Sequence, residues 1–198
     1  MLKTILLILT LAVFSGCSKN SAAIESQNKT PLAVPASQGP NAAGDVHFKV
    51  PPGWVVEKPT SDMRLAQYKL PQAEGDTEDA LLVVYYFGPG QGGTPQANID
   101  RWVGQVKQPD GSESKDKAKT GAMTVNGLQV TTVDVRGTYS GGMSQDSAPK
   151  NSASMYRLRG AIVETPKGSY FIKLTGPEKT VNHWDQTYND YLNSFEFK

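Results

Sequence analysis

The stretch that decides the fold runs from Val83 to Val103 and reads VVYYFGPGQGGTPQANIDRWV. An apolar run meets four glycines, and an amphipathic segment follows. Gly88, Gly90 and Gly93 match the pattern G-x-G-x-x-G, which between a strand and a helix is typical of a dinucleotide-binding loop. In the alternative interpretation the stretch is a structural corner, where glycines let a strand turn sharply into a helix.

The flanking sequence favours the corner. A dinucleotide-binding fold needs strands and helices that alternate around a parallel sheet. Here the helix is followed by the polar stretch 108–119 and then by hairpins. Thr94 and Pro95 predict an N-cap with proline at the first helical position, so Gly93 lies before the helix. Because Thr94 also stands where a Walker loop needs lysine, we predict that the chain binds no nucleotide.

Strand patterns dominate the chain from residue 45 onward. Residues 80–87 (ALLVVYYF) are apolar on both faces, as in a central strand. Asn126-Gly127 is a strong hairpin signal, and Pro166-Lys167-Gly168 indicates another. We predict about seven strands, within 47–57, 64–70, 80–87, 120–125, 128–139, 156–165 and 169–174. Apolar residues at helical spacing predict two helices, at 94–107 and 178–193. The fold class is therefore α+β, with an antiparallel sheet flanked by two helices.

The N-terminus has the pattern of a secretory signal. Lys3 supplies a positive charge, residues 5–14 are apolar, and small residues precede Cys17. The tetrad Phe14-Ser15-Gly16-Cys17 resembles the lipobox of bacterial lipoproteins, whose first residue is usually Leu. The resemblance implies that residues 1–16 are removed and that Cys17 carries diacylglycerol and a further acyl chain, such as palmitate.

Cysteine usage agrees with a lipid anchor. Cys17 is the chain's only cysteine, so an intramolecular disulfide is excluded, and lipidation removes an otherwise reactive thiol. By the same resemblance, Ser18 stands where an Asp would retain a lipoprotein in the inner membrane of enteric bacteria. We therefore expect attachment to the outer membrane, with the protein facing the periplasm.

Composition divides the rest of the chain. Residues 17–44 hold the lipidated cysteine and a tether rich in Ser, Ala, Asn and Pro, which we predict to be disordered. Residues 45–198 form a single α+β domain. Without Lys3 the 20 basic residues become 19, equal to the 19 acidic residues. The mature chain is thus formally neutral, and we expect no nucleic-acid partner.

Few residues suggest chemistry, and we expect neither a metal nor a cofactor. A serine of the polar segment 140–153 paired with His183 would make a hydrolase, although G-x-S-x-G is missing. Carboxylates in 74–79 alternate as in a calcium loop, but Asp79 and Tyr85 stand where such a loop needs Gly and Glu, so a solvated hairpin tip explains them better. The segment 140–153 is either disordered, which its composition favours, or a binding lid, in which Met143 is the large apolar residue that would close over a ligand. Lys173 could hold an anion with the N-terminus of the last helix, although helix capping by Thr175 and Glu178 accounts for that segment.

Three segments carry a family resemblance: Phe48-Lys49-Val50-Pro51-Pro52-Gly53-Trp54, Tyr170-Phe171-Ile172-Lys173-Leu174 and Phe195-Glu196-Phe197. In this order the domain resembles the PsbP-like superfamily, the extrinsic photosystem II proteins and their bacterial relatives. The resemblance implies an antiparallel sheet sandwiched by helices (an α/β/α sandwich) and a non-enzymatic binding or assembly role, in some members as a lipoprotein. No metal or partner site of the family has a matching position here.

The sequence thus predicts a lipid-anchored, non-enzymatic accessory or binding module of the cell envelope, with an envelope protein as the partner to look for. An envelope hydrolase with a serine nucleophile and a small-ligand or calcium-binding lipoprotein remain the alternatives.

Overall fold

The computed structural model describes residues 46–141 and 155–198. The strands in these ranges are β1 (Val46–His47), β2 (Val55–Glu57), β3 (Arg64–Leu70), β4 (Ala80–Tyr86), β5 (Val106–Lys107), β6 (Lys119–Val125), β7 (Leu128–Tyr139), β8 (Tyr156–Thr165), β9 (Gly168–Pro177) and β10 (Glu196–Phe197). The helices there are α1 (Pro95–Val103), α2 (Glu178–His183) and α3 (Asp185–Asn193), with a 3₁₀ turn, η1 (Lys115–Lys117).

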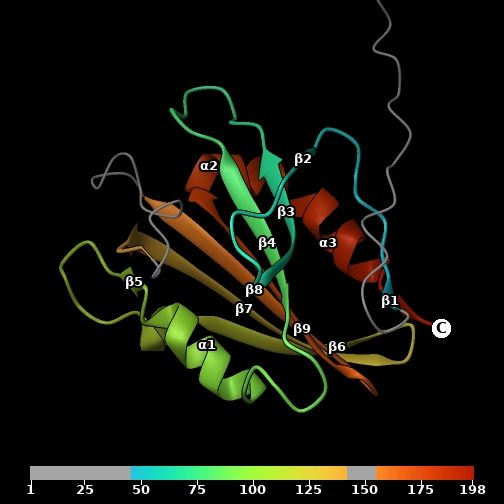
Figure 1. The fold of residues 1–198 in the computed structure, drawn as a ribbon. Helices are drawn as coiled ribbons and strands as arrows, with labels where there is room; N and C mark the ends of the chain where they lie inside the picture. Colours follow the sequence, from blue (N-terminus) through green and yellow to red (C-terminus); the bar gives the residue numbers. More distant parts are fainter. Residues whose placement is uncertain (1–45, 142–154) are drawn as a thin grey trace, which may run out of the picture. The chain divides into compact units, whose positions relative to one another are not determined.

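Within the described ranges, one sheet holds eight strands and every pairing is antiparallel (Figure 1). The strand order is β2-β3-β4-β9-β8-β7-β5, and β6 also pairs with β7. The short strands β1 and β10 form a second sheet of two strands. The predicted α+β class with an antiparallel sheet is confirmed, with more strands than the seven expected because β5 and β10 have only two residues each and give no periodic pattern.

Helices cover both faces of the sheet. Successive side chains of a strand point to opposite faces, so Tyr170, Ile172 and Leu174 of β9 pack with α2 and α3, whereas Phe171 packs with α1. The strands therefore lie between α1 and the pair formed by α2 and α3, as predicted for an α/β/α sandwich (Figure 1). We call the two sides of the sheet the α1 face and the α2/α3 face.

The α2/α3 face has the larger apolar core. Aromatic rings from both ends of the domain meet there, with Trp54 5.2 Å and Phe48 5.4 Å from Tyr191 between ring centroids. On the α1 face, Trp102 packs on β8 directly above Gly160. A Cβ atom at residue 160 would lie 2.5 Å from the indole ring, so this close approach of helix and sheet requires glycine.

The glycine-rich stretch is a corner. Thr94 is the N-cap of α1 and accepts a hydrogen bond from the Ala97 amide at 3.2 Å, with proline next to it, as predicted. Gly92 has φ +89°, and a Cβ there would meet the Phe171 ring at 2.5 Å. Since β4 pairs antiparallel with both β3 and β9, the stretch is not part of a parallel βαβ unit. The helix ends at Val103, earlier than the predicted residue 107, because residues 106–107 pair with β7 as β5.

The second predicted helix, 178–193, is two helices. The helical conformation is interrupted at Trp184, between α2 and α3. The Trp184 indole N–H donates to the Pro71 carbonyl at 2.8 Å. The expected capping by Thr175 is wrong. Asp76, from the connection between β3 and β4, accepts hydrogen bonds from the Thr180 amide at 2.8 Å and hydroxyl at 2.6 Å instead. Both contacts join residues about a hundred positions apart, so local sequence patterns do not show them.

The predicted hairpin at Asn126-Gly127 is confirmed, with Val125 opposite Leu128 and φ of 49° at Asn126. Among the described residues, the helices are all too short or too polar to cross a lipid bilayer.

Candidate binding site on the α1 face

Lys173 is a buried lysine in the middle of the sheet. It lies on β9 between Val83 of β4 and Gly160 of β8, and only 7% of the residue is exposed. Strand alternation directs its side chain to the α1 face, since its neighbours Ile172 and Leu174 enter the opposite core. A cation in this position is costly to bury unless polar partners surround it.

The partners of the Lys173 ammonium are neutral. Its Nζ donates to the Gln105 side-chain oxygen at 3.2 Å and to the Tyr139 hydroxyl at 3.2 Å. The Tyr139 hydroxyl in turn lies 3.4 Å from the same Gln105 oxygen, as a weak donor. Gln105 comes from the loop after α1 and Tyr139 from the end of β7. We call these three residues the Lys173 cluster.

Burial changes the proton affinities in the cluster. Desolvation, followed by the charges of Arg64 and Arg101, lowers the pKa of Lys173 to about 8. Desolvation, followed by the nearby Tyr85, raises the pKa of Tyr139 to about 12. The ammonium is therefore the charged member of the cluster at neutral pH, and its environment disfavours that charge.

Two arginines add positive charge near Lys173. Arg64 of β3 is buried and donates to the Gln67 side chain at 2.6 Å, and Gln67 donates to Glu57 at 3.0 Å. Arg101 of α1 donates to the Asn98 side-chain oxygen. Among the described residues, the ion pairs include none to Lys173, Arg64 or Arg101. Glu57 reaches Arg64 only through Gln67.

A second aromatic ring borders the cluster. Tyr156 of β8 stacks on Tyr139, with ring centroids 5.8 Å apart and planes 12° apart. Desolvation, followed by a hydrogen bond to Glu78, raises the pKa of Tyr156. Tyr139 thus lies between the ammonium and a second aromatic ring.

The α2/α3 face has a buried cation, Arg157, and a partly buried one, Arg159, and each pairs with a carboxylate. Arg157 of β8 donates from Nε to Asp134 at 3.0 Å and pairs with Asp185 at 2.7 Å. Arg159 pairs with Asp185 at 2.8 Å and its guanidinium carbon lies 4.3 Å from the Tyr188 ring centroid. Burial alone would raise the pKa of Asp134, but the hydrogen bond and charge of Arg157 hold it below its ordinary value. This network joins the sheet to the C-terminal helices and is structural.

The structure separates Lys173 from the helix terminus with which the sequence had grouped it. Its ammonium lies on the α1 face, while α2 packs on the other face, so the two do not hold an anion together. Cys17, Met143 and most of the polar segment 140–153 lie outside the described residues.

The described residues do not support the predicted pairing of a serine from 140–153 with His183. The Ser140 hydroxyl donates to the Gln105 carbonyl at 2.9 Å, at the end of β7. His183 ends α2 on the other face and packs edge-on against Trp184, with ring centroids 4.9 Å apart.

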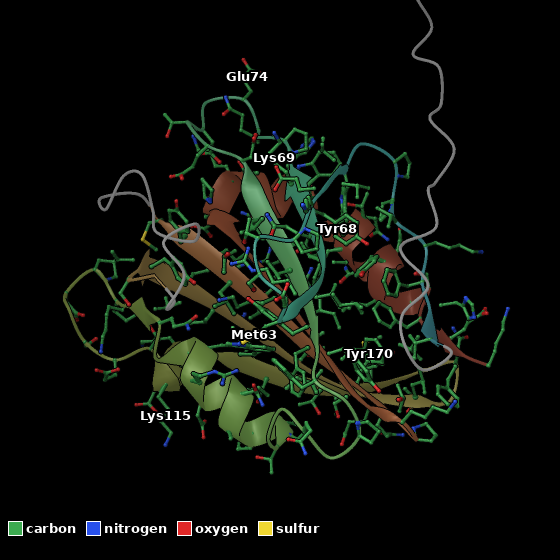
Figure 2. All side chains as sticks on the ribbon, in the orientation of Figure 1. Met63, Tyr68, Lys69, Glu74, Lys115 and Tyr170 are labelled. Atoms are coloured by element: carbon green, nitrogen blue, oxygen red, sulfur yellow. The ribbon has the colours of Figure 1, made fainter. Side chains whose placement is uncertain are left out.

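The acidic stretch 74–79 is engaged in the fold. Asp76 caps α2, and Asp79 accepts the Gln72 amide at 2.8 Å. Glu74 lies at the tip of the connection between β3 and β4, as predicted for a solvated hairpin tip (Figure 2). Among the described residues, His, Cys, Asp and Glu form no group of three that could hold a metal ion.

A shallow groove of about 500 Å³ borders the outer side of α1, where Lys115 lies beside the helix (Figure 2). Its lining mixes Asp100 and Glu113 with Lys115, so its charge selects no ligand. The Lys173 cluster is the stronger candidate because its charge is buried and one-sided.

Comparison with known proteins identifies a fold. The chain matches no protein-family model, and no curated protein matches it in sequence. Among solved structures it is similar to LpqN of Mycobacterium tuberculosis, a protein involved in cell envelope biogenesis, at 10% identity and a TM-score of 0.51, over 84% of this chain and 87% of LpqN.

Two further solved structures are similar. The cyanobacterial PsbP of Synechocystis sp. PCC 6803 matches at 12% identity and a TM-score of 0.48, over 85% of this chain and 96% of that one. Protein PA94 of Pseudomonas aeruginosa, of unknown function, matches at 14% identity and a TM-score of 0.43, over 77% and 91%. The architecture described above confirms the predicted fold, an antiparallel sheet between helices, and the match to LpqN shows the same fold in a solved structure. At such low identity the match is evidence for the fold alone.

Proposed function

We propose that this protein is a lipid-anchored, non-enzymatic accessory or binding module of the bacterial cell envelope, attached through Cys17 to the outer membrane and facing the periplasm. The N-terminal signal pattern and the lipobox-like tetrad 14–17 support the anchor. The fold shared with LpqN, which is involved in cell envelope biogenesis, supports the location.

The observation that carries the binding role is the Lys173 cluster. A buried ammonium with neutral partners destabilises the free protein, and a ligand that supplies the missing charge would relieve this cost. The other polar groups singled out by the sequence, Asp76 and Asp79 among them, already serve caps and turns. A binding role therefore accounts for the Lys173 cluster better than a catalytic role does.

The anchor is tested by expressing the full chain and its Cys17→Ser variant in bacteria. The unaltered chain is expected in the membrane fraction, with the mass of acyl chains on its N-terminal peptide, and at the density of the outer membrane. The variant is expected in the soluble fraction. Recovery of the unaltered chain in the soluble fraction with a free Cys17 thiol would refute the proposed anchor.

A further inference from the structure

We propose that the Lys173 cluster is a binding site for an anionic group, a carboxylate or a phosphate, held by the Lys173 ammonium and the Tyr139 hydroxyl. The inference deepens the proposed function and rests on it, since it names the chemistry of the ligand that the module binds.

The first argument is the contrast in charge between two sides of one sheet. On the α2/α3 face, Arg157 and Arg159 each pair with a carboxylate at 2.8 Å or less. On the α1 face, Lys173 is as deeply buried as Arg157, yet its hydrogen-bond acceptors are an amide and a phenol. A buried charge without an opposite charge is destabilising, and the described residues of the α1 face pair no carboxylate with Lys173, so an external anion is the partner that fits.

The second argument is the inventory of donors. An ammonium has three N–H donors, and the described residues supply two acceptors to Lys173. The Tyr139 hydroxyl donates only weakly to Gln105, at 3.4 Å, so it can turn toward a better acceptor. An oxyanion has lone pairs for both groups, which makes the hydrogen bonds charge-assisted and short.

The third argument is the field around the site. Arg64 and Arg101 lie near enough to disfavour the Lys173 charge, and no described ion pair neutralises either of them. Two described carboxylates are linked to these groups by hydrogen bonds, Glu57 through Gln67 and Glu78 through Tyr156. Among the described residues, three positive charges and two carboxylates are thus linked to the cluster, and this balance favours anions and disfavours metal ions and amines.

The test measures the melting temperature and binding heat of the purified full chain with inorganic phosphate and with acetate, at constant ionic strength set by chloride. Phosphate or acetate is expected to raise the melting temperature in a saturable way. Lys173→Met should abolish this rise, and Tyr139→Phe should weaken the affinity about tenfold, the loss of one charge-assisted hydrogen bond.

Lys69→Met is the matched control. Lys69 lies on β3, two residues from Gln67 and on the same face, but it is half exposed and pairs with Asp79 at 3.8 Å (Figure 2). Its loss should leave anion binding unchanged. Equal weakening by Lys69→Met and Lys173→Met would mean general charge attraction and would overturn the proposal.

Vesicles of phosphatidylglycerol, compared with phosphatidylcholine, distinguish a lipid headgroup from a free anion. Binding to the anionic vesicles that depends on Lys173 assigns the site to headgroups, and saturation by soluble phosphate alone assigns it to free anions. If neither anion nor vesicle produces a Lys173-dependent effect, the anion site is refuted. Lipidation of Cys17 would still stand in that case, so the membrane anchor and the anion site fail separately.

Discussion

The two faces of the sheet treat buried cations in opposite ways. On the α2/α3 face, Arg157 is held by Asp134 and Asp185, and helix and sheet are joined through charge. On the α1 face, Lys173 is held by neutral Gln105 and Tyr139. Arg157 lies on β8, and Lys173 lies next to β8, opposite Gly160. Both residues are buried to a similar extent, so their different partners do not follow from a difference in exposure.

The difference separates a structural charge from an available one. A charge that is paired within the protein helps to hold the fold together, and it gains little free energy from a ligand of opposite charge. A charge without such a partner lowers the stability of the free protein and gains most from a ligand. The comparison therefore predicts that substitutions on one face mainly change stability, and on the other mainly change binding.

Arg157→Ala should have the largest effect on stability. The substitution leaves Asp134 half-buried without its main partner, and breaking such a pair costs about 3 kcal/mol of unfolding free energy. For a domain of this size the melting temperature would fall by roughly 10 °C. Urea denaturation at pH 7 measures the loss directly.

Arg136→Ala is the control on the same face. Arg136 lies opposite Arg157 on β7, but 37% of its side chain is exposed, against 8% for Arg157. Its bond to Glu178 at 2.8 Å is therefore worth no more than about 1 kcal/mol. If Arg157→Ala and Arg136→Ala lose equal stability, burial does not decide how much each ion pair stabilises the fold. The proposed contrast between the two faces would then be contradicted.

Gly160→Ala tests how α1 is seated on its face. The new methyl group would lie 2.5 Å from Trp102 and 2.9 Å from Val133, and such overpacking costs about 2 kcal/mol. Gly104→Ala, at the end of the same helix, has its nearest contact at 3.4 Å and should change stability by less than about 0.5 kcal/mol. A neutral Gly160→Ala would show that α1 shifts freely, which would contradict a preformed cluster at Gln105.

The fold was predictable from sequence where local patterns determine it. The Asn126-Gly127 turn, the apolar strand 80–87 and the Thr94-Pro95 helix start each depend on neighbouring residues, and the structure has all three. The break at Trp184 was not predictable in this way. It depends on the Pro71 carbonyl, 113 positions away in the chain, which takes the indole N–H.

The candidate site was predictable only in part. The sequence indicates Lys173 as a candidate anion-binding residue, but it pairs Lys173 with the N-terminus of the helix that follows in the chain. The alternation of Tyr170, Ile172 and Leu174 contained the missing signal, because it places residue 173 on the other face. The sequence does not predict Gln105 and Tyr139 as site residues, because the pairing of β5 with β7 is what brings them together beside Lys173.

The smallest effect is the most specific one, the dependence of stability on pH through Lys173. The pKa of Lys173 is about 8 in the folded protein and 10.5 ordinarily. Between these values the unfolded chain binds a proton that the folded protein has released, so stability rises with pH in this window. Relative to Lys173→Met, the unaltered protein should gain about 1 kcal/mol of unfolding free energy between pH 8 and pH 9.

The comparison with Lys173→Met isolates this lysine from its neighbours. Both proteins keep Arg64 and Arg101 unchanged, and Tyr139, whose pKa is raised to about 12, stays neutral. Their contributions therefore cancel between the two variants. Below pH 8 the methionine variant should be the more stable of the two, because it removes the buried charge, and saturating phosphate should reverse that order if the anion site exists. Parallel stability curves from pH 7 to pH 9 would instead mean that folding does not lower the pKa of Lys173, and its charge would then be as well compensated as those of the paired arginines on the other face.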